Sequence, residues 1–226
     1  MYINKQSKSM KIVIYTHEAR INYALKLQQN IPKAIIHLDK KTGHLNAVKD
    51  ALRLNYQKGC NYILLIEDDV ILCDNFIQSV EKAIDANINR CPLVFFSISE
   101  KSKEAYDKGY RWIKMKTNAW AQCIAYPEEI IEDLLNYPSV NTKFSDVWLS
   151  MYCLINKIDI MQPLPNFVQH MELKSSIGNP ITIGGRKRIS KIFGTGVNEN
   201  YNNTYNNPYV SKNNRTLKQY INAYGN

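Results

Sequence analysis

The sequence predicts an α/β fold in which a mostly parallel sheet is flanked by helices. In the first hundred residues, short apolar runs of strand length alternate about four times with amphipathic helical patterns, as in a helix-covered parallel sheet. Residues 62–66 are apolar at every position, as expected of a strand buried on both faces. No stretch approaches the roughly 18 apolar residues of a membrane span, so we expect no transmembrane segment.

The first half of the chain carries the regular part of this pattern. The helix predicted at 44–58 has apolar side chains at i, i+3, i+7 and i+11, and Gly59 follows it as a common helix stop. Asp74 is a favourable N-cap for the helix that runs to about residue 88. The expected elements are strands at 11–15, 34–38, 62–66 and 93–98, and helices at 18–30, 44–58 and 74–88.

The second half is more mixed. We expect a strand at 119–126, a helix from Pro127 that ends before Pro138, a helix at 145–156 capped by Ser145, and a short strand at 158–161. The sequence then divides into a main domain at 1–175 and a basic, Asn/Tyr-rich C-terminal extension at 176–226. We expect the extension to be partly flexible.

Positive charge is concentrated in the last quarter of the chain. The whole sequence has a formal net charge of +9, and residues 174–226 hold eight Lys or Arg against the single acid Glu199, which gives +7. This distribution favours an anionic partner, such as nucleic acid, a nucleotide diphosphate or an acidic glycan. A solubilising tail is the alternative interpretation.

Cysteine usage and the N-terminus indicate a cytoplasmic protein. The five cysteines are odd in number and form no CxxC pair, so we expect reduced thiols and no zinc site. The first ten residues are polar and no apolar h-region follows them, so we expect no secretory signal. Nothing in the sequence indicates an oligomeric state.

Three consecutive carboxylates, Glu67, Asp68 and Asp69, follow the apolar run at 62–66. Open α/β sheets bind ligands at the carboxyl ends of their strands. Adjacent acids repel one another and are costly to desolvate, and a divalent cation relieves both costs. Oxygen ligands of this kind suit Mg²⁺ or Mn²⁺ that is shared with substrate phosphates. The alternative is a solvated corner between strand and loop.

This arrangement resembles the GT-A glycosyltransferases. Their acidic motif is usually Asp-x-Asp, and Glu67-x-Asp69 has the same spacing. The string at 65–69, followed by Phe76, is similar to the lipooligosaccharide and collagen galactosyltransferase branch, whose motif is also Glu-Asp-Asp. The resemblance covers about the first hundred residues well and the second hundred loosely.

The resemblance implies roles for residues around a nucleotide-sugar donor. Asp69 would hold Mn²⁺ or Mg²⁺, and Glu67 or Asp68 would contact the ribose or a metal-bound water. Asp39, at the end of the second strand, would lie near the nucleoside base. The loop after the first strand, with Thr16 and Arg20, would bind the donor.

Two later residues complete the expected site. In many GT-A enzymes a late histidine ligates the metal or the diphosphate, and His170 is the candidate here; a structural histidine is the alternative. Asp146, in the first turn of a predicted helix, is the candidate base that removes a proton from the attacking hydroxyl, which implies inversion. An acid there also stabilises any helix, by a few tenths to about 1 kcal/mol.

The predicted activity is metal-dependent transfer of a sugar, from a UDP-sugar in the first instance, to a hydroxyl acceptor. A polyanionic acceptor, such as DNA with a hydroxymethylated base, fits the basic tail, and would place the enzyme in the host cytoplasm if a phage encodes it. A lipopolysaccharide-type surface glycan is the other acceptor hypothesis. Nucleotidyl transfer is disfavoured because residues 14–18 contain no glycine, and a non-catalytic nucleic-acid-binding protein leaves the acidic motif unexplained.

Overall fold

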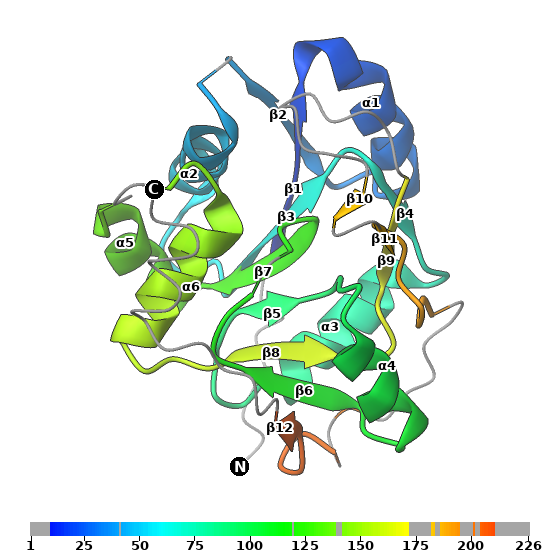
Figure 1. Cartoon of the computed structure of the whole chain (residues 1–226). Coiled ribbons are helices and arrows are strands. Elements are labelled where there is room, and N and C mark those ends of the chain that lie inside the picture. Colours follow the sequence, from blue (N-terminus) through cyan, green and yellow to red (C-terminus); the bar gives the residue numbers. More distant parts are fainter. Residues whose placement is uncertain are drawn as a thin grey trace, which may run out of the picture.

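An eight-stranded sheet with helices on both faces forms the centre of the protein (Figure 1). The structure is a computed structural model that describes residues 10–40, 42–118, 120–138, 142–171, 182–183, 186–194, 201 and 204–210. The strands follow in the order β12 (Tyr209–Val210), β6 (Trp112–Met115), β8 (Ile160–Pro163), β5 (Leu93–Val94), β7 (Cys123–Pro127), β3 (Tyr62–Glu67), β1 (Met10–His17) and β2 (Ile35–Asp39).

The sheet is mostly parallel, as the sequence predicts. In the described part of the chain, four of its seven neighbouring pairs are parallel, including β1 with β2 and β1 with β3. Antiparallel pairs join β7 to β3 and to β5, and β6 to β8. The predicted α/β class is therefore confirmed, with antiparallel pairs on both sides of β7 and between β6 and β8.

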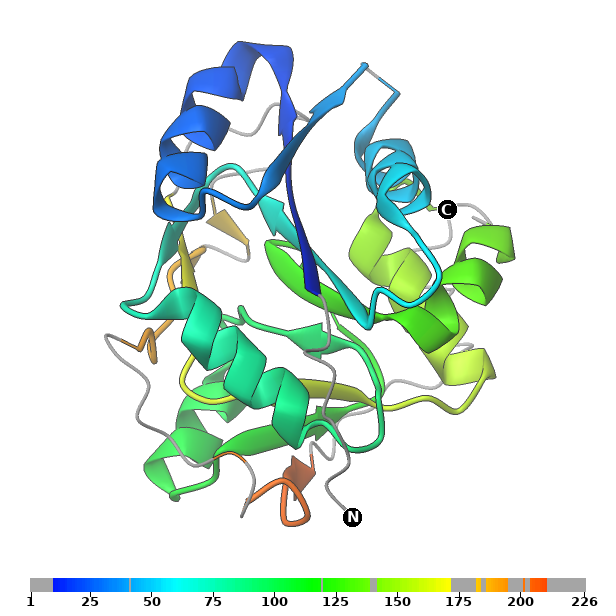
Figure 2. The ribbon, with the colours of Figure 1, turned by 180° about the vertical axis from the view of Figure 1, so that it is seen from behind.

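The helices cover the sheet in two layers. One layer holds α1 (Ile21–Asn30) and α3 (Phe76–Ala86), and the other holds α2 (His44–Asn55), α5 (Glu128–Asn136) and α6 (Ser145–Ile155). Seen from behind, α3 lies across the sheet (Figure 2). A further helix, α4 (Glu100–Asp107), packs against β6.

Side-chain alternation along β1 assigns each position to one layer. Ile12 and Ile14 pack in the cluster that contains α1 and α3, whereas Val13 and Tyr15 pack in the cluster that contains α2, α5 and α6. Successive side chains of a strand point to opposite faces. Tyr15 and Thr16, at the carboxyl end of β1, therefore face different helix layers.

A small second sheet connects the acidic motif to the late histidine. The short strand β4 (Val70–Leu72) directly follows Asp69 and pairs antiparallel with β9 (Val168–His170). In this register Val70 lies opposite His170. Two short strands, β10 (Thr182–Ile183) and β11 (Arg186–Lys187), form a separate antiparallel pair.

Several predicted boundaries were wrong, for local reasons. Helix α3 begins at Phe76 after Asn75, whose φ of 54° is left-handed, so Asp74 is not its cap. Ser145 is the first residue of α6 and not its cap. The strand predicted from residue 119 begins at Cys123, because the Asn118 side chain hydrogen-bonds the Trp120 backbone in a turn.

Other boundaries differ by a few residues. The helix predicted at 44–58 ends at Asn55, and the strand predicted at 93–98 covers Leu93–Val94. All five cysteines are free and buried, as expected. Among the described helices, none has both the length and the apolar composition to cross a bilayer.

Two tyrosines beyond residue 176 belong to the core. Tyr201 and Tyr205 are 2% and 4% exposed and pack against Trp112 with edge-on ring contacts. Trp112 Nε1 donates to the Tyr201 carbonyl at 3.1 Å, and the Tyr205 hydroxyl donates to Asn87 Oδ1 at 2.7 Å. The described parts of the predicted extension therefore cover one edge of the main domain. The basic residues Lys174, Lys212, Arg215 and Lys218 lie outside the described residues.

Candidate functional site

The candidate site lies at the carboxyl ends of β1 and β3. Glu67 is the last residue of β3, and Asp68 and Asp69 form the turn that leads to β4. Asp68 and Asp69 are each 5% exposed. A solvated corner is therefore the wrong interpretation of the acidic motif, since two of its three carboxylates are buried and need compensating partners.

Glu67 is held on the α2 side of the sheet. Tyr15 and Glu67 are register partners in the β1–β3 pair. The Tyr15 hydroxyl donates to Glu67 Oε1 at 2.7 Å, and His44 Nε2, at the first residue of α2, lies 3.1 Å from the same oxygen. Gln122 Nε2 donates to Glu67 Oε2 at 3.3 Å. Both carboxylate oxygens are thus engaged within the protein.

Asp68 is held on the α1 side. The Thr16 hydroxyl donates a short hydrogen bond to Asp68 Oδ2, and Arg20 Nη2 lies 2.5 Å from Asp68 Oδ1. Burial nevertheless outweighs these two partners and raises the pKa of Asp68 to about 7. At neutral pH the Asp68 carboxyl is therefore divided between its charged and neutral forms.

Asp69 lies between Arg20 and His170. Its Oδ2 is 2.7 Å from Arg20 Nη2 and 3.3 Å from His170 Nε2. Its backbone carbonyl accepts the Met171 amide at 2.8 Å, which fixes the start of β4 against the end of β9. Burial alone would raise the pKa of Asp69, but His170 and Arg20 outweigh it and hold the pKa well below its usual range.

Asp146 lies in the first turn of α6, partly buried, on the α2 side of the site. Burial raises its pKa, while the charge of His44 and the Val147 amide, which donates to Asp146 Oδ1 at 2.9 Å, lower it. The pKa of His44 is raised in turn: burial lowers it, but the hydrogen bond to Glu67 and the charges of Glu67 and Asp146 outweigh that effect. His44 is therefore coupled electrostatically to both Glu67 and Asp146.

Asp39 lies at the same edge of the sheet, opposite His17 in the β1–β2 register. Its Oδ1 accepts from both the amide and the hydroxyl of Thr42, each at 3.0 Å. Asp39 therefore stabilises the turn between β2 and α2. Side-chain contacts join Thr16, Arg20, Asp68, Asp69 and His170 to one another, whereas Asp39 hydrogen-bonds to Thr42.

The sequence analysis missed Tyr15, His44 and Gln122, which hold Glu67. No motif marks them, because their approach depends on strand register and on the angle at which α2 meets the sheet. The one available signal is the alternation of β1. It places Tyr15 on the α2 face, and the parallel register then sets it beside Glu67.

Two protein side chains, Asp69 and His170, are suitable ligands for a divalent metal at this position. Asp69 Oδ1 is buried and has no hydrogen-bond donor among the described residues, and a buried acceptor of this kind requires a partner. His170, 4% exposed, supplies a neighbouring imidazole. The described ranges contain no group of three or more His, Cys, Asp or Glu arranged for a metal. Mg²⁺-type sites often use one or two protein groups together with substrate phosphates.

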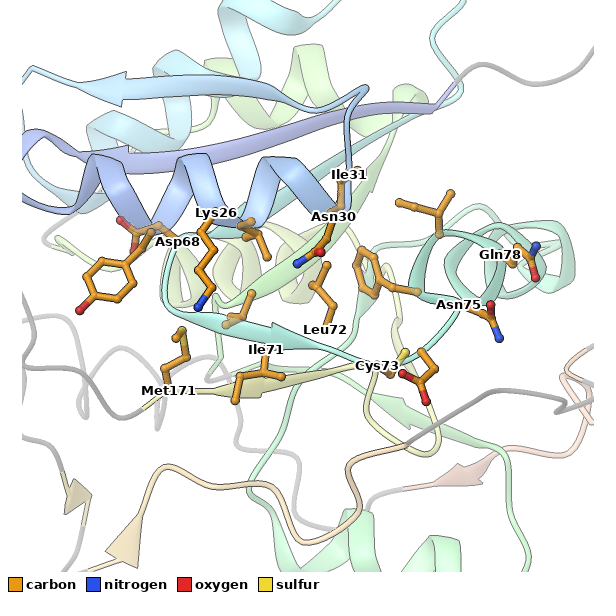
Figure 3. Close-up of a pocket in the computed structure, with 16 residues that line it drawn as sticks. Lys26, Asn30, Ile31, Asp68, Ile71, Leu72, Cys73, Asn75, Gln78 and Met171 are labelled. Atoms are coloured by element: carbon orange, nitrogen blue, oxygen red, sulfur yellow. The ribbon is translucent and has the colours of Figure 1, made fainter.

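A groove of about 690 Å³ lies between α1 and β4 and reaches Asp68 at one end (Figure 3). Its middle is apolar, and the Lys26 side chain points from α1 across the groove towards β4. Its other polar side chains are a phenol, carboxylates and amides, from Tyr23, Asp68, Asp74, Asn30, Asn75 and Gln78. The groove therefore offers both donors and acceptors with little net charge, which suits a polyhydroxyl ligand.

Comparisons with known proteins give distant likenesses only. No family model and no curated protein matches the chain. Among solved structures, a mannosyltransferase from Pyrobaculum calidifontis in complex with GDP-Man and Mn²⁺ is 10% identical, over 74% of this chain and 58% of the other, with a TM-score of 0.49. The chain thus spans less than two thirds of that protein's length.

Two further solved structures show the same level of likeness. A putative glucose-1-phosphate thymidylyltransferase from Bacillus anthracis in complex with a sucrose is 9% identical, over 72% of this chain and 89% of the other, with a TM-score of 0.46. A mutant Drosophila β-1,4-galactosyltransferase 7 with manganese, UDP-Gal and xylobiose is 7% identical, over 82% of both chains, with a TM-score of 0.39. Likenesses this distant do not decide between glycosyl and nucleotidyl transfer.

Proposed function

We propose that this protein is a glycosyltransferase that moves a sugar from a nucleotide-sugar donor, in the first instance a UDP-sugar, to a hydroxyl acceptor. The observation that carries the proposal is the environment of Asp69. One of its oxygens is buried without a donor among the described residues, and the other lies 3.3 Å from His170 Nε2. Asp69 and His170 would hold Mn²⁺ or Mg²⁺ at the carboxyl end of β3.

The surrounding residues support binding of a diphosphate. When bound, the metal would supply Lewis-acid neutralisation of the charge that develops on the leaving diphosphate. Thr16 lies at the end of β1 and Arg20 in the short 3₁₀ helix η1 (Glu18–Arg20) that follows it, and both contact Asp68 from the α1 side. A guanidinium group is well suited to phosphate oxygens. Both residues are therefore proposed to contact the donor.

Asp146 is proposed as the general base, with inversion at the sugar. Its pKa is raised by burial, towards the range in which a carboxylate is an effective base near neutral pH. His44 interacts electrostatically with both Glu67 and Asp146, and its charge limits the rise in the pKa of Asp146. Glu67 is proposed to support the donor through Tyr15 and His44 and not as a metal ligand, because its oxygens are already hydrogen-bonded.

A polyanionic acceptor, with DNA as the specific case, is supported by the position of the consecutive basic residues Arg186, Lys187 and Arg188. Lys187 is exposed, and the following segment is joined to β9 because the Ser190 amide donates to Gln169 Oε1 at 2.7 Å. Positive charge therefore lies beside the strand that carries His170. DNA affinity should then fall steeply with added salt, and the double variant Lys187→Ala/Arg188→Ala should reduce the salt slope by about 2. Affinity that does not change with salt would rule out this acceptor.

A surface glycan is the second candidate acceptor, and the groove between α1 and β4 favours it. Its mixed polar groups and low net charge match hydroxyl groups better than phosphates. Under this alternative, Tyr23→Ala and Gln78→Ala in the groove would lower transfer to a lipopolysaccharide-derived oligosaccharide. The release of UDP by donor hydrolysis would stay unchanged in both variants.

The activity is tested by UDP release from a panel of UDP-sugars, with Mn²⁺ and with EDTA. We expect release from one UDP-sugar with Mn²⁺, and loss of release in EDTA and in Asp69→Ala. Asp74→Ala is the matched control, because Asp74 lines the groove beyond the end of β4 that is opposite the Val70–His170 pair, and it should retain activity. Retention of activity by Asp69→Ala would refute the metal assignment.

A further inference from the structure

Arg20 forms ion pairs with two neighbouring carboxylates of the acidic motif. Its Nη2 atom lies 2.5 Å from Asp68 Oδ1 and 2.7 Å from Asp69 Oδ2. The Arg20 side chain is 14% exposed, and those of Asp68 and Asp69 are 6% and 7% exposed. A largely buried cation thus compensates two of the three acids.

Part of the hydrogen-bonding capacity of Arg20 is unused. Its Nε atom is buried and has no hydrogen-bond acceptor among the described residues. Its Nη2 atom faces both acids at once, so the contact is not the forked pairing of a guanidinium group with one carboxylate. A phosphate group would offer acceptors that the two carboxylates do not supply.

Arg20 and a divalent metal would compete for Asp69. Arg20 contacts Oδ2, and the unpartnered Oδ1 belongs to the same carboxylate. Two cations on one buried carboxylate repel each other strongly, since the interior screens charge poorly. A diphosphate removes this conflict, because it adds negative charge and oxygen acceptors for both cations.

We propose that Arg20 is a tethered counter-ion that makes metal binding conditional on the diphosphate: it opposes the metal alone, and exchanges its carboxylate partners for phosphate oxygens when donor and metal enter together. The exchange of carboxylate partners for phosphate oxygens rests on the proposed function. The opposition of Arg20 to the metal alone rests only on its ion pairs with Asp68 and Asp69. Arg20 is in this sense a positioning residue that sets the order of assembly.

The test measures Mn²⁺ binding by calorimetry and by electron paramagnetic resonance, with and without UDP. The variants are Arg20→Gln and Arg20→Met, which remove the charge, and Arg20→Lys, which keeps it. Arg53→Gln is the control, since the side chain of Arg53 is 57% exposed and pairs with Asp50 at the surface. Circular dichroism checks the fold, and the two neutral variants guard against failure of either one to fold.

We expect both neutral variants to bind Mn²⁺ alone at least about fivefold more tightly than the wild type, and UDP with Mn²⁺ at least about fivefold more weakly, a typical coupling between sites. Arg20→Lys and Arg53→Gln should bind Mn²⁺ alone like the wild type. Neutral variants that bind Mn²⁺ alone no more tightly than the wild type would overturn the proposal. If the neutral variants bind Mn²⁺ more tightly but neither they nor the wild type bind nucleotide, the opposition of Arg20 to the metal would be supported and the proposed function refuted.

Discussion

The Tyr15 hydroxyl lies 2.7 Å from Glu67 Oε1, and the two residues are direct partners in the parallel register of β1 and β3. This contact places Glu67 in an environment different from that of Asp68 and Asp69. Glu67 is turned to the α2 side and bound by neutral and imidazole donors, whereas Asp68 and Asp69 contact Arg20. Three consecutive acids thus belong to two different environments.

Tyr15→Phe should lower stability without changing metal affinity. The variant deletes one hydrogen bond to a charged acceptor, and such bonds contribute about 1.5–3 kcal/mol. Because His44 and Gln122 still engage Glu67, we expect a loss near the lower end, about 1.5 kcal/mol, in the free energy of unfolding by urea. A weaker affinity of this variant for Mn²⁺ alone, without nucleotide, would contradict the separation of Glu67 from the metal ligands.

His170→Gln should weaken Mn²⁺ binding in the presence of UDP at least about tenfold, because loss even of groups that support metal ligands typically costs tenfold or more. His37→Gln is the matched control, since His37 lies on β2 opposite Tyr15 and away from β9. Calorimetry on both variants separates a ligand from a structural histidine. Equal affinities in the wild type and His170→Gln would leave His170 as a structural group.

Activity should fall on the acid side as Asp146 is protonated. Burial raises the pKa of Asp146, so the acid limb of the pH–activity profile should lie above the pKa of a free aspartate, which is roughly 3.9. The charge of His44 lowers that pKa, so His44→Gln should move the limb of kcat/KM to higher pH. Asp146→Asn should reduce UDP release at least about 100-fold. The pH profile with water as acceptor measures both effects.

The same two raised pKa values make the stability contributions of Asp146 and His44 both fall as pH rises. The folded pKa of Asp146 is raised, so its contribution is largest when the carboxyl is neutral and falls as pH rises from the unfolded to the folded pKa. The folded pKa of His44 is also raised, so its contribution is complete below the unfolded value of about 6.5 and is lost as pH rises through the folded value. An unshifted acid limb in His44→Gln would contradict the coupling of the two residues.

Tyr201→Ala should destabilise the main domain. Tyr201 is 2% exposed, packs against Trp112 and Phe167, and donates its hydroxyl to the Leu164 carbonyl at 3.2 Å. Truncation of a large buried aromatic residue costs about 3–5 kcal/mol. Tyr23→Ala is the control. Tyr23 is 38% exposed, so its truncation should change the free energy of unfolding by less than about 1 kcal/mol. A similar small change in Tyr201→Ala would show that the segment is not part of the core.

The sequence predicted the elements whose signal is local. The continuous apolar run at 62–66 gave β3 and its position inside the sheet, and the apolar spacing at 44–58 gave α2 from its first residue, His44. Helix starts were predicted less well. Asp74 and Ser145 are good caps by residue type, but a left-handed Asn75 and the cap position of Phe144 set the observed starts.

The site was predictable in its acids and not in their partners. Glu67, Asp68 and Asp69 stand together in the sequence, whereas the pairing of β4 with β9 is needed to bring His170 to Asp69. The contact of Arg20 with two acids depends on the turn after β1, which composition does not specify. The antiparallel direction of β7 likewise depends on the path of the chain between residues 95 and 122.

The most direct test of the account is the thermal shift of the wild type and of Asp69→Ala against a panel of nucleotide sugars, with Mn²⁺ and with EDTA. The account predicts that one UDP-sugar stabilises the wild type in Mn²⁺, by about 2.7 kcal/mol at one hundred times its Kd, and that EDTA or Asp69→Ala abolishes the shift. A shift that survives both changes would contradict the metal site, and no shift with any nucleotide sugar would contradict the proposed function.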